Sequence, residues 1–362
     1  MSVAAADLFA LERRRVRRGA AALAGLGLAL TALLLAGLGH GAVAIAPLQS
    51  VAILADAVGL PAPAPFEPVQ RTVLLSIRLP RVVLGLLAGA SLAVAGAALQ
   101  GLFRNPLADP GLIGVSSGAG LAAAAAIVFG APAAALLPAA LAGFFLPLAA
   151  FAGGLAATLV VYRIATRDGR TQVATLLLAG VALNAIANAG LGLLIFMSDE
   201  QELRDLNFWL LGSLGGNTWR DLLPVAPFVI LPTLLLTLLA RPLNALLLGE
   251  TEAGHLGFAV ERLKRGIVVL VALAVGASVA LTGIIGFIGL VVPHLVRLAL
   301  GPDHRLLLPA SVLLGAALML GADLLARTLV LPAELPIGIL TSCVGGPFFL
   351  WLLVRRRDGG LW

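Results

Sequence analysis

The chain alternates long apolar runs with short breaks that carry its arginines, glycines and prolines. Several runs reach the ~20 consecutive apolar residues that an α-helix needs to cross the core of a bilayer. The pattern predicts an all-α polytopic membrane protein with a single transmembrane domain over residues 1–362. Its ten predicted helical segments are 19–38, 80–103, 111–130, 138–162, 173–196, 222–240, 265–287, 290–300, 305–330 and 336–354, of which 290–300 is too short to cross alone.

The helix predicted from Val82 to Phe103 is unusually rich in small residues. These residues let neighbouring helices approach its backbone closely, as packing in a membrane requires: Gly85, Gly89, Ala90, Ser91, Ala93, Gly96 and Ala97. A polar break over 104–111 follows, and its two prolines cannot continue the helix. The backbone groups freed at this break need partners, so we expect it to be buried in protein or to face water.

Part of this pattern recurs at a constant offset of 187 residues, the separation of Gly89 from Gly276. The matching residues are Gly89, Ala90, Ser91, Ala93, Gly96 and Pro106, and then Gly276, Ala277, Ser278, Ala280, Gly283 and Pro293. Chance matches arise easily in a chain with 42 glycines. If the repeat is real, it is typical of a transporter whose pathway lies between two related halves.

Composition supports a membrane protein, because 60% of residues are hydrophobic and only 12% are charged. The net charge of +6 could suggest a nucleic-acid partner. The arginines instead gather in short tracts beside apolar segments, where they orient helices in a membrane. The single cysteine, Cys343, excludes a disulfide framework and a cysteine metal cluster within the chain.

The distribution of positive charge predicts the orientation of the helices. Eighteen of the 24 Lys and Arg residues fall on one side of the predicted membrane, including the basic segment 1–18 and the tail 355–362. Positive charge favours the cytoplasm, so both termini are predicted there. The helices at 80–103 and 265–287 then run in opposite directions, which makes the repeat an inverted one. The run at 19–38 is too long for a cleaved signal peptide and is interpreted as a retained first helix.

Two connections are longer than turns. Residues 39–79 form an outer segment in which we expect prolines to break any helix: Pro61, Pro63, Pro65 and Pro68. Residues 242–264 form a cytoplasmic segment that predicts two short amphipathic helices joined near Gly249 and Gly254. Such an element could press into a partner protein, or it could rest on the lipid interface.

Seven motifs give the chain a resemblance to a known family. They are Arg78–Arg81 (RLPR), 104–111 (RNPLADPG), 209–214 (WLLGSL), 249–257, 286–297 (GFIGLVVPHLVR), 301–305 (GPDHR) and 334–338 (ELPIG). Over residues 70–354 the chain resembles the iron-siderophore, haem and vitamin B12 family of ABC import permeases. The resemblance implies a ten-helix inner-membrane permease that works as a homodimer, with its pathway between the two copies. It also implies two cytoplasmic ATPase subunits and a periplasmic substrate-binding protein.

The sequence agrees that nucleotide chemistry belongs to another chain. Its only lysine is Lys264, which follows a leucine, so a G-x-x-x-x-G-K-[ST] phosphate loop is absent from the sequence. We therefore expect a transporter subunit rather than an enzyme. No cofactor is expected to be permanently bound, and ATP and Mg²⁺ would be used by the partner.

The resemblance assigns three arginines to docking of the binding protein: Arg78, Arg81 and Arg327. Guanidinium groups suit carboxylates across a wet interface. Two alternatives remain open. Arg327 could pair within its own helix with Asp323, four residues earlier. Arg78 and Arg81 could instead anchor the chain in the lipid–water interface.

The resemblance also assigns the cytoplasmic segment 249–257 to ATPase coupling. Its residues are Gly249, Glu250, Thr251, Glu252, Ala253, Gly254, His255, Leu256 and Gly257. Small residues would let this segment lie flat in a groove of the ATPase, and either glutamate could pair with a basic residue there.

The resemblance implies an outer gate near the charged break that follows the fifth helix, with Arg204, Phe208 and Trp209 as its residues. Haem is a flat apolar ring with two carboxylates, which an arginine beside two aromatic residues could recognise. The stretch most resembles haem-uptake members, so haem is the predicted cargo, ahead of a ferric siderophore and cobalamin. The alternative is a solvated loop in which Arg204 pairs with Glu200.

Two further patterns have ordinary explanations. The four histidines share no spacing typical of a metal site, so hydrogen bonding is the better interpretation, and no metal site is predicted: His40, His255, His294 and His304. Residues 114–118 fit G-x-S-x-G, which leaves an intramembrane serine protease as a remote alternative. A strand before the serine is not predicted, and packing by small residues explains the match equally well.

Overall fold

The computed structural model describes residues 3–41, 43–330 and 333–357, and it is almost entirely helical. Its first elements are α1 (Val3–Gly39), α2 (Pro47–Ala57), α3 (Pro68–Thr72), the π-helix η1 (Val73–Arg78), α4 (Leu79–Phe103), the 3₁₀ turn η2 (Pro110–Ile113), α5 (Val115–Ala135), α6 (Ala139–Ala142) and α7 (Phe145–Ala165). The remaining elements are β1 (Thr166–Arg167), β2 (Arg170–Thr171), α8 (Val173–Met197), α9 (Glu200–Leu211), α10 (Trp219–Leu238), α11 (Ala240–Leu248), α12 (Glu250–His255), α13 (Val260–Thr282), α14 (Ile288–Leu300), α15 (His304–Thr328) and α16 (Ile337–Arg357).

The helices have the lengths of a membrane protein. Within the described ranges, seven are long and apolar enough to cross a bilayer, at Arg17–Gly39, Pro68–Phe103, Phe145–Ala165, Val173–Met197, Trp219–Leu238, Val260–Thr282 and His304–Thr328. Three shorter apolar helices lie at Val115–Gly130, Ile288–Leu300 and Ile337–Trp351. The polytopic all-α class is therefore confirmed, and the short segment predicted at 290–300 is a helix of 13 residues.

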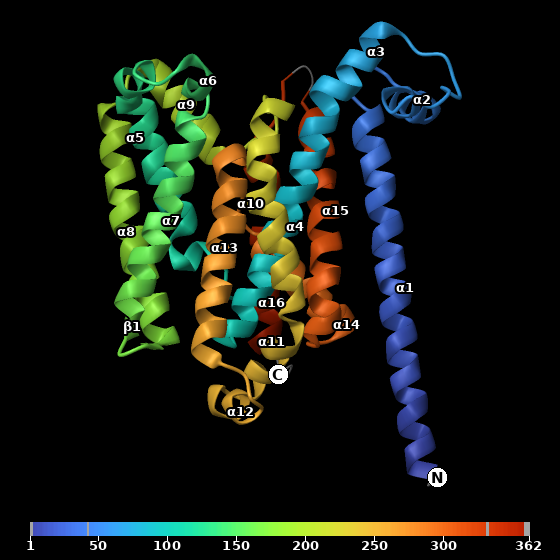
Figure 1. Cartoon of the computed structure of the whole chain (residues 1–362), viewed down its shortest axis with the longest axis vertical. Coiled ribbons are helices and arrows are strands. Elements are labelled where there is room, and N and C mark those ends of the chain that lie inside the picture. The colour runs from blue at the N-terminus through green and yellow to red at the C-terminus, as the bar shows by residue number, and fades with distance from the viewer. Residues whose placement is uncertain (1–2, 42, 331–332, 358–362) are drawn as a thin grey trace.

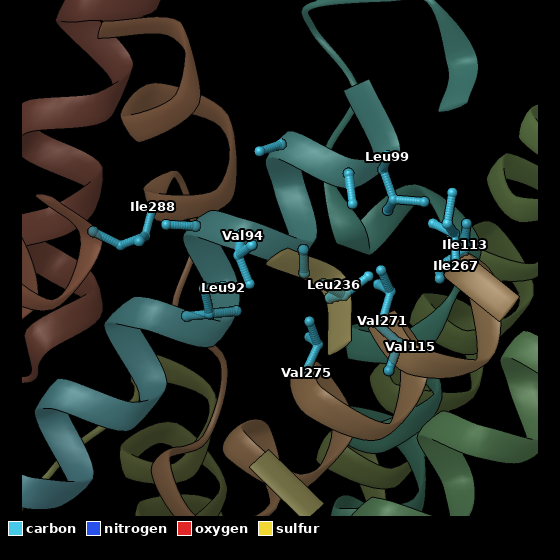
Figure 2. Packing of buried hydrophobic residues seen from close by; sticks show 14 of the residues in the cluster. Leu92, Val94, Leu99, Ile113, Val115, Leu236, Ile267, Val271, Val275 and Ile288 are labelled. Atoms are coloured by element: carbon cyan, nitrogen blue, oxygen red, sulfur yellow. The ribbon is translucent and has the colours of Figure 1, made fainter. Parts of the chain in front are cut away.

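Helix α4 forms the centre of the bundle. In its most apolar stretch 83% of residues are buried, compared with 17% in α8. It contacts α10, α13, α14 and α15. Figure 2 shows Leu92, Val94 and Leu99 among buried side chains from α10, α13 and α14. The small-residue helix is thus the one on which the rest of the bundle packs.

Small residues bring the backbones of α4 and its neighbours into contact. A Cβ atom at Gly96 would lie 1.8 Å from the carbonyl oxygen of Gly289. A Cβ atom at Gly89 would lie 2.3 Å from the carbonyl oxygen of Gly315 on α15. Real Cβ atoms cannot approach an oxygen this closely, so α14 and α15 could not keep these positions beside a larger residue.

Helices α4 and α13 run in opposite directions, as the charge distribution predicts (Figure 1). Where they cross, the hydroxyl oxygens of Ser91 and Ser278 lie 2.8 Å apart. These two serines are equivalent positions of the 187-residue repeat. Equivalent residues of an inverted repeat meet only where the axis relating the two halves passes between them, so this contact supports the repeat.

The polar break after α4 and the end of α13 both contain backbone in the left-handed region. Arg104 and Gly114 have φ of 49° and 83°, and Gly283 and Phe287 have φ of 69° and 67°. The predicted helix 265–287 is therefore wrong at its end, because α13 stops at Thr282. At the first break, the Gln100 side-chain amide donates to the carbonyl oxygen of Ala108. This buried carbonyl lies outside any helix, so the side chain supplies the hydrogen bond that a helix would otherwise give it.

The outer segment also differs from its prediction. Prolines 61, 63 and 65 lie outside the helices, as expected, but helix α2 precedes them. Pro68 does not break a helix; it occupies the first turn of α3, where a missing N–H costs nothing. From there the chain continues through η1 into α4 without interruption. Between α7 and α8, residues predicted as a simple break form the short antiparallel hairpin β1–β2.

The two ends of the bundle differ in character. The start of α1, the β1–β2 hairpin, α12 and the end of α16 lie at one end (Figure 1). Helices α2, α3, α6 and α9 lie at the other, which we call the outer end.

Replacing Gly96 with alanine should destabilise the bundle by more than about 3 kcal/mol, because the new methyl group forces α4 and α14 apart. Gly25 on α1 is the matched control, since a Cβ atom there meets nothing within 4 Å. Gly25→Ala should be neutral or slightly stabilising. Thermal unfolding of the purified protein in detergent measures both, and equal midpoints for the two variants would contradict this account of the packing.

Candidate functional site

Arg78, the last residue of η1, is buried at the outer end of the bundle. Its guanidinium donates to the carbonyl oxygens of Leu38 and Gly39 at 2.7 and 2.9 Å, and also to that of Val43. The last carbonyls of a helix have no partners within it, so cationic donors stabilise this end. Arg78 therefore fixes the end of α1 to the start of α4.

Arg81 and Arg327 form the centre of a buried ionic network. The Nε atom of Arg81 lies 2.8 Å from an oxygen of Asp323, and its Nη1 atom lies 2.8 Å from an oxygen of Glu334. The Nε atom of Arg327 lies 3.1 Å from the other oxygen of Asp323. Arg327 also donates to the carbonyl oxygen of Gly37 at 3.2 Å. The network joins α1, α4, α15 and the segment before α16.

The structure thus brings the three predicted docking arginines together at the outer end, but as buried residues that are 5%, 9% and 6% exposed as a whole. The predicted alternative for Arg327, a pair with Asp323, is present. Anchoring of Arg78 and Arg81 in the lipid interface is wrong, because both side chains point into protein. Sequence reasoning missed Glu334 as a partner, although it opens the ELPIG motif that carries part of the resemblance.

The predicted gate segment is helix α9 rather than a loop. The Asp199 carboxylate accepts hydrogen bonds from the backbone N–H groups of Gln201 and Glu202 and begins the helix as a capping box. Arg204 is exposed and donates to the side-chain oxygen of Gln201 at 3.1 Å. The alternative of a solvated loop with a pair between Arg204 and Glu200 is therefore wrong. The D-x-x-E capping pattern could have indicated the helix.

A cavity of about 360 Å³ opens beside α9. Phe208 and Trp209 line it together with Asp205, whereas Arg204 is not among its lining residues. The remaining lining residues include Ser213, Gly215, Leu281, Thr282 and Gly283. Two of the three predicted gate residues thus share one cavity, where α9 meets the end of α13.

The coupling segment lies at the opposite end of the bundle (Figure 1). Helices α11 and α12 join at Gly249, which has φ of 126°. Leu248 and Leu256 are 68% and 61% exposed. Exposed residues of the segment also include Thr251, Glu252, Gly254, His255 and Gly257, whereas Ala253 is buried and Glu250 is half-buried. The two short helices are as predicted, except that Gly254 lies inside α12 and residues 260–264 begin α13.

Packing and hydrogen bonds explain the two remaining patterns, the G-x-S-x-G stretch and the histidines. The Ser117 hydroxyl donates to Asn184 on α8, and a Cβ atom at Gly118 would lie 2.5 Å from the carbonyl oxygen of Gly153 on α7. Close helix packing therefore accounts for the G-x-S-x-G pattern.

A ring nitrogen of His304 lies 2.8 Å from the side-chain oxygen of Asn244. Among the described residues, no group of three or more His, Cys, Asp or Glu side chains could hold a metal ion.

A bundle of membrane-length helices, with a cavity at one end and exposed short helices at the other, defines a polytopic membrane protein whose two ends are built for different contacts. The model of the FecCD transport family matches residues 21–355, and the chain belongs to this family. It is the permease subunit of an ABC importer, with ATP hydrolysis in a separate chain.

Characterised relatives and a solved structure agree with this family. The chain is 52% identical to the hemin transport system permease protein HmuU of Yersinia pestis over 285 residues, which cover 78% of this chain and 84% of the relative. It is 46% identical to the cobalamin import permease BtuC of Halobacterium salinarum, over 78% of this chain and 73% of the relative. A metal-chelate type ABC transporter in an inward-facing conformation superposes with a TM-score of 0.78 and 34% identity, over 92% of this chain and 98% of that one.

Replacing Arg81 with methionine should destabilise the permease by about 3–5 kcal/mol, because the buried Asp323 then loses one of its two cations. Arg71→Met is the matched control, since Arg71 pairs with Asp56 while their side chains are 49% and 43% exposed. An exposed pair contributes only ~0–1 kcal/mol. Thermal unfolding in detergent compares the two, and similar losses would mean that the outer network is not a structural element.

Proposed function

We propose that this permease carries haem into the cell across the bacterial inner membrane, as one half of a homodimer with the pathway between the two copies. The observation that carries the cargo assignment is the 52% identity to a hemin permease, compared with 46% to vitamin B12 permeases. A ferric siderophore and cobalamin remain the alternative cargoes. No cofactor is permanently bound in this proposal, and the partner ATPase uses ATP and Mg²⁺.

The end of the bundle that bears α12 faces the cytoplasm in this proposal. The basic residues at the start of α1 and in the connections α7–α8 and α11–α13 support this orientation, because positive charge favours the cytoplasmic side. Both termini are then cytoplasmic, and α2, α3 and α9 face the periplasm. Ten helices per protomer would cross or enter the membrane, the three shorter ones included.

Helix α8 supports the homodimer. It presents large apolar side chains that are mostly exposed in the single chain: Leu178, Val181, Ile186, Leu193 and Phe196 are 57–86% exposed. In the proposed dimer this face meets the second copy and lines the pathway. Alternating access follows when the two copies rock against each other and open the cavity first to one side and then to the other.

Docking of the periplasmic binding protein at the outer arginines remains part of the proposal. The Glu334 side chain is 50% exposed although its partner Arg81 is only 11% exposed. A carboxylate of the binding protein could therefore replace Glu334 at Arg81 without first exposing the Asp323 pair. In this arrangement, Arg78 and Arg327 shape the docking surface through the end of α1.

Exposed Leu248 and Leu256 support coupling of α11 and α12 to the ATPase, because apolar side chains of this size at an aqueous face favour a protein partner. Gly254 leaves open space beside α12, since a Cβ atom there meets nothing within 4 Å. A groove of the ATPase could therefore approach this helix closely.

Replacing Leu256 or Gly254 with glutamate should leave the permease folded and abolish its stimulation of ATP hydrolysis by the partner ATPase, because the new charge would be buried in the groove without a partner. The measurement is ATP hydrolysis by the reconstituted complex, with thermal unfolding as the control for folding. Normal stimulation in both variants would remove the coupling assignment.

The cargo assignment is tested at Arg204. Its exposed guanidinium is free to leave Gln201 and receive a haem carboxylate, so Arg204→Ala should slow haem uptake into proteoliposomes that contain the ATPase, the binding protein and ATP. Arg204→Lys should recover only part of the rate, because an ammonium keeps the charge but loses the bidentate fork. Uptake of a ferric siderophore and of cobalamin is measured beside it. Transport of either one without haem transport would overturn the cargo while leaving the permease intact.

A further inference from the structure

Lys264, the single lysine of the chain, is buried in the first turns of α13 with only 2% of its surface exposed. Its Nζ atom lies 2.6 Å from an oxygen of Glu250 on α12 and 3.0 Å from an oxygen of Glu261 on α13. It also donates to the carbonyl oxygen of Thr171 on β2 at 2.9 Å. The ammonium therefore contacts three separate elements at the cytoplasmic end.

This ammonium is both hydrogen-bonded and paired with two carboxylates. A lysine has three N–H donors and no acceptor. Lys264 donates hydrogen bonds to Thr171 and Glu261, and its charge also pairs with the Glu250 carboxylate. Glu261 also bridges Lys264 and Thr171, because its second oxygen accepts a hydrogen bond from the backbone N–H of Thr171 at 2.9 Å. Removing a charge from water is expensive unless it is fully paired, so the local structure depends on these contacts.

The three elements continue to functionally distinct parts of the permease. Helix α12 carries the exposed coupling residues. The β1–β2 hairpin begins α8, and α8 leads at its other end to α9 with Phe208 and Trp209. Helix α13 ends at Thr282, which lines the same outer cavity. Lys264 thus joins the coupling helix to α13, which reaches the outer cavity, and to α8, which leads to the cavity through α9.

We propose that Lys264 is a positioning residue that transmits movement of α12 to α8 and α13, and through them to the outer cavity. This inference rests on the proposed function, because it takes α12 as the surface that the ATPase moves. When the ATPase displaces α12, the pair with Glu250 draws the first turns of α13 and the hairpin with it. Both helices then shift as rigid bodies, so the displacement reaches the cavity through the end of α13 and through α9, which follows α8.

Glu250→Gln is the selective test, because Lys264 keeps Glu261 and Thr171 while its link to α12 is weakened. The Glu250 side chain is 41% exposed, so the variant should fold. In proteoliposomes with the ATPase, the binding protein and haem, with cobalamin as a second cargo, it should lower the cargo moved per ATP hydrolysed about tenfold, a typical coupling factor. Arg262→Gln, an exposed charge removal in the first turn of α13, is the control and should keep the wild-type ratio.

A double-mutant cycle with Lys264→Met shows whether the pair acts as a unit. If it does, the double variant should have the same transport-to-ATP ratio as Lys264→Met alone. Hydrogen exchange should also increase in hairpin residues 166–171 of Lys264→Met but not of Glu250→Gln, because only the first variant breaks the bond to Thr171. Should Lys264→Met fail to fold, Glu250→Gln and its control carry the test alone.

The outcomes separate this inference from the function on which it rests. A wild-type ratio in Glu250→Gln, or independent and additive effects in the cycle, would overturn the role of Lys264 even if Leu256→Glu abolishes ATPase stimulation. Normal stimulation in Leu256→Glu would instead remove the coupling surface itself.

Discussion

The close contact between the backbone of α4 and those of its neighbours is the constraint on which this structure depends. Helices in lipid gain little from hiding apolar side chains from one another, because the lipid is equally apolar. Association must come from close packing, which requires small residues where the helices cross. Gly89 and Gly96 supply that closeness on α4, and the meeting of Ser91 with Ser278 joins the two halves of the chain at their shared axis. The cavity and the coupling helices lie at opposite ends of the bundle that this contact makes possible.

Two buried ionic networks lie at opposite ends of the bundle, and each ties together elements that are far apart in the sequence. At the outer end, Arg81 and Arg327 share Asp323, while Arg78 closes the end of α1. At the opposite end, Lys264 makes contacts with α12, with Glu261 of its own helix and with the hairpin. Each network is expensive to desolvate and is stable only when complete. Such networks hold one arrangement firmly, and they can pass a displacement between the elements that they join.

The sequence predicted much of this architecture and less of its sites. Apolar runs predicted the helices, and the small residues of α4 predicted that other helices pack closely on it. The end of α13 was misplaced, because the left-handed backbone at Gly283 and Phe287 interrupts a stretch whose hydropathy is continuous. Helix α9 was interpreted as a gate segment or a loop because its charges outweighed its capping pattern. The resemblance assigned the three outer arginines to one site, but it did not predict that they are buried.

What the sequence by itself determined is the class of protein, its helical segments, the opposed directions of α4 and α13, and the absence of a phosphate loop. These follow from local composition and from charge, which act along the chain. Only the tertiary structure decided which polar groups meet. Glu250 and Lys264 are 14 positions apart, and Thr171 is 93 from Lys264, so no local pattern predicts that one ammonium contacts both. The same holds for Arg81, whose partners Asp323 and Glu334 lie more than 240 residues away. Their contacts exist because the packing of α4 brings distant segments together.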